Sequence, residues 1–317
     1  MNREIPIFFT IDNSYAPFLA TALNSAIKNA SEERQYHAFV LHRELSEENA
    51  VRLKALETDN FTIEPVPMKA NFDALDDRLS NRLRCDYFTL TIYFRLFIPN
   101  MFLQYDKGIY VDSDVVFTSD IAKLFDIEIG DNLIGACNDL SIADIPPLVS
   151  YTENAVGVKK QEYINSGVLL MNLKAMRKCD LEGHFLNLLN TYHFDTIAPD
   201  QDYLNAICNG RIYYLNESWN AMPNDARPTL AHTDLIHYNL FSKPWCYDDV
   251  QYGDEFWKYA QESGFIDEIK AYKANYSDEK KKADSECLEL LIRRGTEISE
   301  TEVTFKKLYQ KGVKIRL

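Results

Sequence analysis

The 317-residue sequence lacks the features that place a chain in a membrane or on nucleic acid. No apolar run approaches the roughly 20 residues that a membrane-spanning helix needs. The first residues, MNREIPIFFTIDNSY, turn polar after a run of strand length, which argues against a secretory signal. Positive charge is in deficit, and a net charge of -14 would repel a phosphate backbone. We therefore expect a cytoplasmic protein that does not bind DNA or RNA.

Cysteine is scarce, and its spacing suits neither a zinc site nor a disulfide framework. The cysteines form no Cys-x-x-Cys pair, and no histidines lie at the matching distance. They are Cys85, Cys137, Cys179, Cys208, Cys246 and Cys287. We expect all of them to be ordinary reduced residues.

The sequence does contain enough apolar material for a large core. Hydrophobic residues make up 46% of it and aromatic residues 13%, which excludes a disordered chain. Residues 270–317 carry 12 Lys and Arg against 8 Asp and Glu, so this tail is basic while the rest of the chain is acidic. The basic tail is consistent with contact to an anionic membrane or an acidic partner, and equally with a solvated helical surface.

The first part of the sequence predicts alternating strands and helices. The expected elements are a strand at Ile5–Ile11, a helix at Tyr15–Asn29, a strand at His37–Leu41, a helix at Ser46–Thr58 and a strand at Phe61–Val66. Ser46 is the expected N-cap of the second helix. This alternation predicts a mostly parallel sheet flanked by helices.

A further expected strand, Gly108–Val111, ends in two carboxylates, Asp112 and Asp114. A helix over Tyr87–Phe97, ended by Pro99, precedes it. Ligands of open α/β sheets bind beyond the carboxyl ends of strands, where these aspartates fall. Two such carboxylates can hold Mg²⁺ or Mn²⁺ against a diphosphate. About two Asp-x-Asp pairs are expected by chance in a chain this rich in Asp, however, and a second one occurs at residues 200 and 202.

The remaining part predicts a mixed pattern and then a helical end. The expected elements are strands at Leu133–Cys137, Gly167–Asn172 and Arg211–Leu215 and a helix at Asp200–Cys208. A polar excursion with Pro146 and Pro147 separates the first two strands, and such long connections often build a site wall or lid. Composition shifts near Trp245, so we expect one α/β domain over residues 1–245 and a small helical extension over residues 246–317.

Several separated motifs resemble, in type and order, those of glycosyltransferase family 8, a family of retaining transferases. They are FFTIDNSY at 8–15, YFRL at 93–96, YVDSD at 110–114, GACND at 135–139, INSGVLLMNL at 164–173, DQDYLN at 200–205 and HYNLFSKPW at 237–245. The resemblance covers roughly residues 5–245. It implies the GT-A fold, a mixed and mostly parallel sheet flanked by helices, and a UDP-sugar donor.

The resemblance implies a metal site and a diphosphate contact. Asp112, Asp114 and His237 would ligate Mn²⁺, or Mg²⁺, and Lys243 would reach the diphosphate. A set of one imidazole and two carboxylates suits Mn²⁺ better than Ca²⁺. Taken alone, His237 is also consistent with a structural histidine, and Lys243 with a solvated surface residue.

The sequence departs from the family near these residues. Relatives often have a Gly-Pro pair after His-Tyr-Cys, whereas this chain has Asn239, Leu240 and Phe241. A missing glycine removes an easy approach of the backbone to a phosphate. Asn13 and Ser14 also replace an Asp-Asn pair of some relatives, so we expect the ribose contacts to differ in detail.

The resemblance also implies contacts with the rest of the sugar nucleotide. The uridine would be held by Thr10, Ile11, Asp12 and Tyr15, and other parts of the sugar nucleotide by Arg95 and Ser113. Two structural alternatives remain open at this point. Asp12 or Asn13 would only cap the next helix. Arg95 would form a structural ion pair with Asp86 or Asp112.

A polar set that follows apolar strands resembles the residues that hold the transferred sugar. It consists of Asp139, Asn165, Ser166, Gly167, Asp200 and Gln201, of which Asp139, Asp200 and Gln201 are the expected catalytic residues. Carboxylates and amides grip sugar hydroxyls through directional hydrogen bonds. As structural alternatives, Asn-Ser-Gly forms a turn and Asp200 caps a helix. Because an amide is a poor nucleophile, we expect front-face transfer in which Gln201 and Asp200 stabilise a cation-like sugar.

These expectations describe a Mn²⁺-dependent hexosyltransferase that uses UDP-glucose or UDP-galactose. Its acceptor would be a glycan, a glycolipid or a glycoprotein, in the synthesis of a cell-surface polysaccharide or lipopolysaccharide. A Mg²⁺-dependent phosphatase with an aspartyl nucleophile also has a strand followed by Asp-x-Asp, although its aspartates are expected on the first strand of the domain. A nucleotide-sugar binding protein without turnover would keep the same fold.

Overall fold

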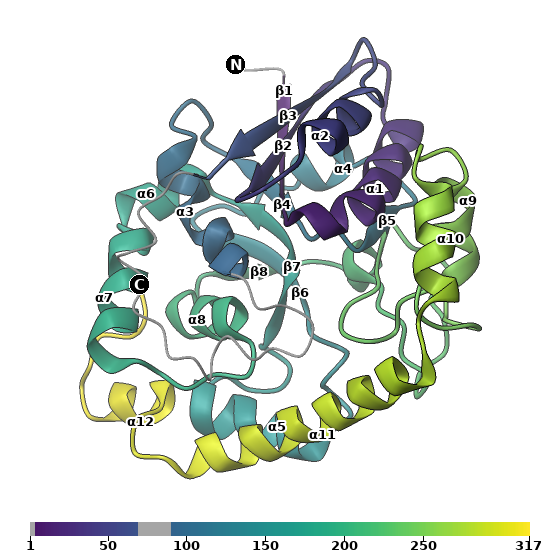
Figure 1. Cartoon of the computed structure of the whole chain (residues 1–317). Helices are drawn as coiled ribbons and strands as arrows, with labels where there is room; N and C mark the ends of the chain where they lie inside the picture. The colour runs from purple at the N-terminus through teal and green to yellow at the C-terminus, as the bar shows by residue number, and fades with distance from the viewer. Residues whose placement is uncertain (1–3, 69–89) are drawn as a thin grey trace.

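The computed structural model describes residues 4–68 and 90–317, which fold around a seven-stranded sheet with a two-stranded ribbon beside it (Figure 1). In spatial order the sheet contains β3 (Phe61–Pro67), β2 (Gln35–His42), β1 (Glu4–Ile11), β4 (Gly108–Val111), β7 (Ile164–Met171), β6 (Ile134–Asn138) and β8 (Ile212–Tyr214). Strand β7 is antiparallel to both of its neighbours, and all other pairs are parallel. The expected mixed, mostly parallel sheet is therefore confirmed.

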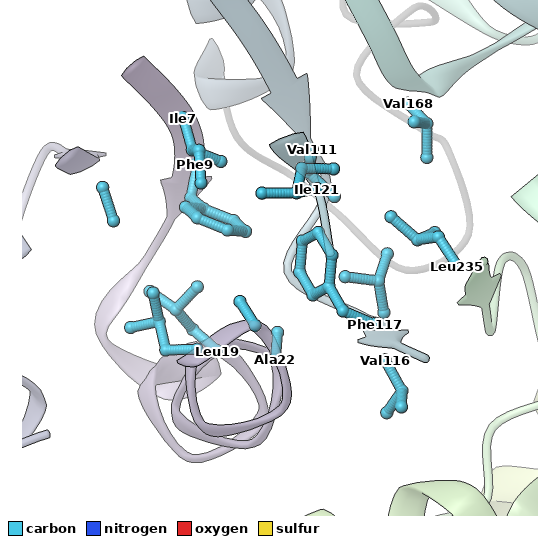
Figure 2. Close-up of a cluster of buried hydrophobic side chains, with 14 of the residues drawn as sticks. Ile7, Phe9, Leu19, Ala22, Val111, Val116, Phe117, Ile121, Val168 and Leu235 are labelled. Atoms are coloured by element: carbon cyan, nitrogen blue, oxygen red, sulfur yellow. The ribbon is translucent and has the colours of Figure 1, made fainter. Parts of the chain in front are cut away.

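Alternate side chains of the strands face two separate hydrophobic cores. In β1, Ile7 and Phe9 pack in one core and Phe8 packs in the other, as the two-residue period of a strand requires. Figure 2 shows the first core, where Ile7 and Phe9 lie near Leu19 and Ala22 of α1 (Ala16–Asn29). Because both faces of the sheet are covered, the central strands read as continuous apolar runs.

The predicted second helix is present as α2 (Glu47–Lys54). Ser46 accepts a hydrogen bond from the Asn49 backbone N–H at 3.2 Å, which confirms the predicted N-cap. The helix ends earlier than predicted, because Thr58 pairs with Phe61 in a tight turn that leads into β3.

The prediction that Pro99 ends a helix is wrong. Helix α3 runs over Phe94–Met101 with Pro99 inside it, after a 3-10 turn at Leu90–Tyr93, and the predicted start at Tyr87 lies outside the described residues. A proline removes one helical hydrogen bond. Burial of the apolar face of α3 in the second core offsets this cost.

Strand β7 begins at Ile164 rather than at the predicted Gly167, so its polar first residues belong to the sheet. Asn165 and Ser166 are each only 2% exposed. The alternative interpretation of Asn-Ser-Gly as a turn is therefore wrong. Strands β6 and β8 and helix α8 (Pro199–Ile207) lie where the sequence predicts them, apart from small differences at their ends.

A short antiparallel ribbon of β5 (Val115–Phe117) and β9 (Leu235–His237) was not expected from the sequence. Its register sets Val115 opposite His237. Since β5 follows Asp114 directly, this pairing brings His237 beside the two carboxylates at the end of β4.

Further helices pack in the second core, on the other face of the sheet. They are α6 (Leu173–Lys178), α7 (Leu181–Tyr192), α5 (Pro146–Tyr151), which its two prolines begin, and a π-helical turn at Thr152–Val156. A short helix α4 (Ala122–Phe125) follows the ribbon strand β5. The excursion between β6 and β7 therefore contains α5, which packs against a C-terminal helix.

The last part of the chain is helical, as expected. It forms α9 (Gly253–Ala260), α10 (Ile266–Ala274), α11 (Asp278–Glu300) and α12 (Phe305–Gln310). Trp245 stacks on Phe18 of α1 at 4.4 Å between ring centroids, and α9 and α10 also pack on α1. None of the described helices is long and apolar enough to span a membrane, and the described cysteines are free thiols.

Candidate active site

A pocket opens at the carboxyl ends of β1 and β4, among the polar motifs of the sequence. It encloses about 700 Å³ of free space, part of it open to solvent. Of the predicted site residues, it is lined by Thr10, Ile11, Asp12, Tyr15, Arg95, Asp112, Ser113, Asp114, Asn165, Ser166, Gly167, Gln201 and His237. Asp139, Asp200 and Lys243 lie behind this lining, and each of them bonds to a residue within it.

Asp112, Asp114 and His237 form a cluster that can hold a metal ion. One ligand atom from each residue lies within 4.8 Å of the other two. His237 Nε2 is 3.3 Å from Asp114 Oδ1 and 3.8 Å from Asp112 Oδ2. The strand end at β4 and the register of the ribbon therefore assemble three potential ligands from two distant parts of the sequence.

A chain of hydrogen bonds fixes which nitrogen of His237 carries a proton. The Gly167 N–H and Asn220 Nδ2 both donate to Asn165 Oδ1, at 2.9 and 3.0 Å. Because Asn220 Nδ2 is used in this bond, the other amide atom, Asn220 Oδ1, faces His237 Nδ1 at 2.9 Å. An amide oxygen can only accept a hydrogen bond, so His237 Nδ1 is the donor. In a neutral imidazole, Nε2 then points a lone pair at the two carboxylates. This tautomer is the one that a metal ligand needs, and Asn220 orients it.

The two oxygens of Asp114 have different surroundings. Oδ2 accepts a hydrogen bond from Lys243 Nζ at 2.6 Å, whereas Oδ1 is buried and has no donor among the described residues. Burial alone would raise the pKa of Asp114, but the positive charge of Lys243 beside it lowers that pKa well below its usual value. An ionised oxygen without a donor, facing an imidazole lone pair, fits a divalent cation.

Gly167 leaves the space that the cluster occupies. A Cβ atom on this residue would lie 2.2 Å from His237 Cε1 and 2.8 Å from Asp112 Oδ2. The Gly167 carbonyl also accepts a hydrogen bond from the Asp112 N–H at 2.8 Å. Close approach of the β7 backbone therefore fixes Asp112, and any side chain at position 167 would displace a potential ligand.

Arg95 connects this cluster to the floor of the pocket. Its Nη2 donates to Asp112 Oδ1 at 2.9 Å, and its Nη1 donates to the Ser166 carbonyl at 2.6 Å. Its Nε lies 3.1 Å from Asp200 Oδ2. Burial opposes the charge, but Asp112 and Asp200 raise the pKa of Arg95 above its usual value. The predicted ion pair with Asp112 is therefore present, while Asp86 lies outside the described residues.

Asp12 caps a turn and also lines the pocket. Its Oδ1 accepts hydrogen bonds from the Ser14 N–H at 3.1 Å and from Ser14 Oγ at 2.6 Å, so Asp12 caps the 3-10 turn Asn13–Tyr15, while α1 itself has no side-chain cap. Thr10 Oγ1 lies 2.7 Å from the hydroxyl of Tyr110, which donates to Asp112 Oδ1 at 2.7 Å. Tyr110 thereby joins the end of β1 to the carboxylate cluster. Contact of Asp12 with a ligand stays a prediction.

Asp139 lies behind the pocket wall and holds two amides. Its Oδ2 accepts hydrogen bonds from Gln201 Nε2 at 2.9 Å and from Asn165 Nδ2 at 3.2 Å, and its Oδ1 accepts from Ser141. Gln201 Oε1 accepts from the Ser166 N–H at 3.0 Å. The amide of Gln201 is therefore held at both ends, and Asp139 sets its orientation.

The second Asp-x-Asp pair lies in the first turn of α8, outside the lining. Asp200 Oδ2 accepts from Ser166 Oγ at 2.9 Å, and Asp200 thus acts on the pocket through Ser166 and Arg95. The alternative that Asp200 caps α8 is wrong, because Asp202 accepts the Ala198 N–H, at 3.0 Å.

The segment after β9 keeps a buried lysine and an unusual backbone. Lys243 is 5% exposed and donates to Asp114 and to the Tyr238 carbonyl, so it is not a solvated surface residue. Leu240, at the position where the family often has glycine, has a φ of 53°. This left-handed conformation costs a residue with a Cβ roughly 1–2 kcal/mol. The backbone conformation that favours glycine is thus adopted here by a leucine that lines the pocket.

Several site residues were not found from the sequence. Tyr110 precedes Asp112 by two residues on a strand, and strand periodicity was a usable signal that both side chains share a face. Asn220, in the 3-10 turn Glu217–Asn220, carries no motif that predicts its bond to His237. The remaining lining residues, Ile92, Asn239 and Leu240, likewise follow only from the fold.

Comparison with known proteins connects this site to a family. The sequence profile of Glycosyl transferase family 8 matches residues 6–249. A putative glycosyltransferase of Haemophilus influenzae is 27% identical over 226 residues, which cover 71% of this chain and 65% of the relative. The lipopolysaccharide 1,2-glucosyltransferase of Escherichia coli is 27% identical over 200 residues, 55% of this chain and 56% of the relative. The chain thus spans less than two thirds of the length of either relative.

Solved structures share the fold. The galactosyltransferase LgtC, in complex with donor and acceptor sugar analogs, matches with a TM-score of 0.66 at 26% identity, over 81% of this chain and 95% of that chain. The apo structure of the bifunctional glycosyltransferase WbbM matches with a TM-score of 0.70 at 24% identity, over 86% of this chain and 52% of that chain. These matches confirm the expected GT-A fold. Because the family profile covers well over half of its residues, the chain belongs to glycosyltransferase family 8.

Proposed function

We propose that the chain is a metal-dependent, retaining hexosyltransferase that moves glucose or galactose from UDP to an acceptor. The observation that carries this proposal is the cluster of Asp112, Asp114 and His237, whose ligand atoms lie within 4.8 Å of one another at a pocket. The same pocket presents the amides of Asn165 and Gln201, which suit a sugar. All of these residues lie within residues 1–245, to which we assign catalysis.

The ligand set favours Mn²⁺, with Mg²⁺ as the second choice, because it combines an imidazole nitrogen with carboxylate oxygens. Asp112, Asp114 and His237 would hold the ion. When bound, it supplies positive charge that neutralises UDP as UDP leaves the sugar. Lys243 contributes a fixed positive charge close by, since its ammonium is 2.6 Å from Asp114.

We assign the uridine to the end of the pocket at β1. A base needs an apolar wall and paired hydrogen bonds, and Thr10, Ile11, Asp12 and Tyr15 offer both there. The diphosphate would lie near Ser113 and Lys243. The sugar would lie against Asn165, Ser166, Gly167 and Gln201, with Asp139 and Asp200 holding these residues from behind. Arg95, which lines the same pocket, would contact another part of the sugar nucleotide.

We propose front-face transfer for the chemical step. The carboxylates that line the pocket, within the described residues, are Asp12, Asp112 and Asp114, and two of these are assigned to the metal. Asp139 and Asp200 stand close to Gln201 but lie behind the lining, bonded to Gln201 and Ser166, so we assign no carboxylate as the nucleophile. The acceptor oxygen would bond to the anomeric carbon as the bond to the UDP phosphate oxygen breaks, and that oxygen would take the acceptor proton. Gln201, oriented by Asp139, would stabilise the cation-like sugar through its carbonyl dipole.

The relatives support the assignment of donor and catalytic residue. One is a glucosyltransferase and one a galactosyltransferase, so we keep both hexoses. A solved LgtC variant replaces an active-site glutamine by glutamate, which supports a catalytic role for Gln201. We propose a glycan acceptor, free or linked to lipid or protein, in cell-surface polysaccharide or lipopolysaccharide synthesis.

Titration of UDP with and without Mn²⁺ tests the proposal. We expect binding that depends on Mn²⁺, followed by slow hydrolysis of UDP-glucose or UDP-galactose when no acceptor is present. Binding that is the same without metal would contradict the metal site. Metal-dependent binding without hydrolysis or transfer of any UDP-sugar in a panel would instead support a binding protein. Release of phosphate from simple phosphoesters, lost in Asp112→Asn, would support the phosphatase.

We further propose that the basic end of the chain contacts an anionic membrane surface on its cytoplasmic side. Residues 270–317 carry 12 Lys and Arg against 8 Asp and Glu, in a chain of net charge -14. Tyr309 is 46% exposed, and the Arg316 guanidinium lies 4.4 Å above its ring. Aromatic and basic side chains together suit a lipid interface. Equal sedimentation with vesicles of anionic and of neutral lipid would remove this proposal.

A further inference from the structure

Helix α8 presents two faces with different polar bonds. All residues of α8 are buried. On the front, Gln201 lines the pocket and Asp200 bonds to Ser166 and Arg95. Asp202, roughly 100° farther around the helix, bonds to parts of the chain that the proposed chemistry does not use. Asn205, about one turn after Gln201, bonds to the Gln201 carbonyl and to Ile164. The position of Gln201 therefore also depends on what holds Asp202 and Asn205.

Asp202 is held by two tyrosines. The hydroxyl of Tyr151 donates to its Oδ2 and the hydroxyl of Tyr163 donates to its Oδ1, both at 2.7 Å. The Ala198 N–H also donates to Oδ2, at 3.0 Å. A fully buried carboxylate requires such donors, because an unpaired one is costly in a low-dielectric interior. Both oxygens are thus occupied away from the pocket, and the residue next to Gln201 is fixed.

Asn205 joins the same helix to β7. Its Oδ1 accepts from the Ile164 N–H at 2.8 Å, and its Nδ2 donates to the Ile164 carbonyl at 2.9 Å and to the Gln201 carbonyl at 3.0 Å. The backbone of Gln201 is therefore tied to the strand that carries Asn165 and Ser166.

Tyr151 is in turn packed against the C-terminal helix α11. Figure 1 shows α11 running alongside α5, and the contacts between the two helices confirm this. An ideal Cβ on Gly295 of α11 would lie 3.4 Å from Tyr151 Cβ and 3.4 Å from a methyl of Leu148. Leu291 and Ile298 are buried on the same helix at the spacing of one face. Glycine at position 295 thus lets α11 come close to the residue that holds Asp202.

The segment after α11 touches α8 directly. The ring of Phe305 packs edge-on against Tyr203 of α8 at 5.0 Å between centroids and stacks on Phe194 at 3.9 Å. Farther along, the Leu317 N–H donates to the Ile207 carbonyl at 3.0 Å. The C-terminal residues therefore contact α8 at its middle and at its end, in addition to the contact through Tyr151.

We propose that residues 278–317 act as a strap that positions α8, and with it Gln201, for catalysis, and that Tyr151 is the positioning residue that links this strap to Asp202. The inference rests on the proposed function, since it assigns Gln201 to the sugar. Asp202 is, in this view, an anchor for the helix rather than a nucleophile. The strap controls the chemical step, while metal and UDP bind to residues that it does not touch.

The test compares Tyr151→Phe with Tyr36→Phe. Each substitution removes one tyrosine hydroxyl that is bonded to an aspartate, Asp202 for Tyr151 and Asp120 for Tyr36, and the second pair lies outside the strap and the pocket. For Tyr151→Phe we expect kcat to fall by about 10- to 100-fold, because small misplacements of a catalytic group are costly. We expect the Kd for UDP in the presence of Mn²⁺ to stay within about twofold, since the metal ligands are untouched. Tyr36→Phe should leave both constants unchanged.

A second pair of variants acts from α11 itself and covers the case in which Tyr151→Phe fails to fold. Gly295→Ala adds a methyl at ordinary contact distance from Tyr151, whereas Gly295→Leu pushes further atoms toward it. We expect Gly295→Leu to lower kcat with little change in the Kd for UDP, and Gly295→Ala to retain wild-type turnover. In an Asp202→Asn background, Tyr151→Phe should have a smaller effect than in the wild type, because the two act through one contact.

The outcomes separate this inference from the proposed function. If the wild type shows neither Mn²⁺-dependent UDP binding nor release of sugar, the proposed function fails. If the wild type is active and folded Tyr151→Phe or Gly295→Leu turns over as fast as its control, the strap has no role in positioning α8. If Tyr151→Phe and Gly295→Leu each lost kcat and UDP affinity to the same extent, the inference would also be refuted, because such losses would indicate a general loss of structure.

Discussion

The two Asp-x-Asp pairs of this chain have the same spacing and opposite environments. Asp112 and Asp114 follow a strand and converge with His237 at one place. Asp200 and Asp202 lie in the first turn of a helix, and their carboxylates point to different partners. Asp114 Oδ1 and Asp200 Oδ1 are both buried without a donor among the described residues, but Asp114 Oδ1 lies beside two other potential metal ligands. The first pair is arranged to receive a cation, whereas the carboxylates of the second pair bond to Arg95, to Ser166 and to two tyrosines.

The difference shows that the secondary structure around an Asp-x-Asp motif decides whether its two carboxylates can share a ligand. On a strand end, residues two apart share a face, so their carboxylates meet at one place. On a helix, residues two apart point roughly 200° apart, so a shared ligand is excluded. The pairs can therefore be distinguished by substituting the same residue type in each.

The largest expected effect comes from Asp112→Asn. It removes a charged metal ligand while Arg95 keeps its contact with Asp200, so we expect hydrolysis of the UDP-sugar to fall by more than about 100-fold. Asp202→Asn is the matched control in the second pair, and its Mn²⁺-dependent UDP binding should stay close to that of the wild type. If Asp202→Asn lost UDP binding as fully as Asp112→Asn, the proposed division between the pairs would be wrong.

The next effect concerns Gln201, which lies between the two aspartates of the second pair. Gln201→Ala removes the amide that Asp139 and the Ser166 N–H hold toward the pocket. We expect kcat to fall by about 100-fold with an unchanged Kd for UDP, because the lost contact acts on the sugar in the transition state. Single-turnover kinetics and calorimetry measure the two constants separately. An unchanged kcat would remove Gln201 from catalysis.

A smaller effect is expected from Gly167→Ala, which adds one methyl beside the first pair. That carbon would lie 2.2 Å from His237 Cε1, so the imidazole must move and we expect Mn²⁺ affinity to fall by about 10-fold or more. Gly253→Ala, whose added carbon comes no closer than 3.8 Å to any neighbour, is the control. Equal Mn²⁺ affinity in the two variants would show that the cluster tolerates a displaced imidazole.

The smallest effect compares two tyrosines, one beside each pair. Tyr163→Phe removes one donor from buried Asp202, so we expect a loss of about 1–3 kcal/mol in the free energy of unfolding. Tyr110→Phe removes a donor from Asp112, which is 28% exposed and keeps Arg95, so the loss should be smaller. Urea denaturation measures both. A larger loss for Tyr110→Phe would contradict the assignment of Asp202 as the structural anchor and of Asp112 as the metal ligand.

Apolar periodicity was sufficient for the strands and helices of residues 5–66 and for several later elements, and the resemblance of the separated motifs to a family was sufficient for most of the pocket lining. The sequence did not predict that Asn165 and Ser166 belong to β7, since polar residues next to a glycine are typical of a turn. In the structure, bonds to Asp139 and Arg95 satisfy them inside the sheet.

Long-range register accounts for the rest. The place of His237 follows from the pairing of β5 with β9, which no local pattern predicts. Asn220 is likewise positioned by the fold, and its role appears only once the hydrogen bond to His237 Nδ1 is known. The tyrosines that hold Asp202 lie far from it in the sequence. The spacing of the Asp-x-Asp pairs alone therefore could not show that Asp202 has a structural role and Asp114 a role in metal binding.

The most direct test of the central claim is a titration of Mn²⁺ followed by electron paramagnetic resonance in the presence of UDP. The six-line signal of the free ion reports unbound Mn²⁺. We predict that the wild type and Asp202→Asn each remove one Mn²⁺ per chain from this signal, and that Asp112→Asn removes none at the same concentrations. A wild-type chain that leaves the signal unchanged, or an Asp202→Asn variant that behaves like Asp112→Asn, would contradict the assignment of the metal to Asp112, Asp114 and His237.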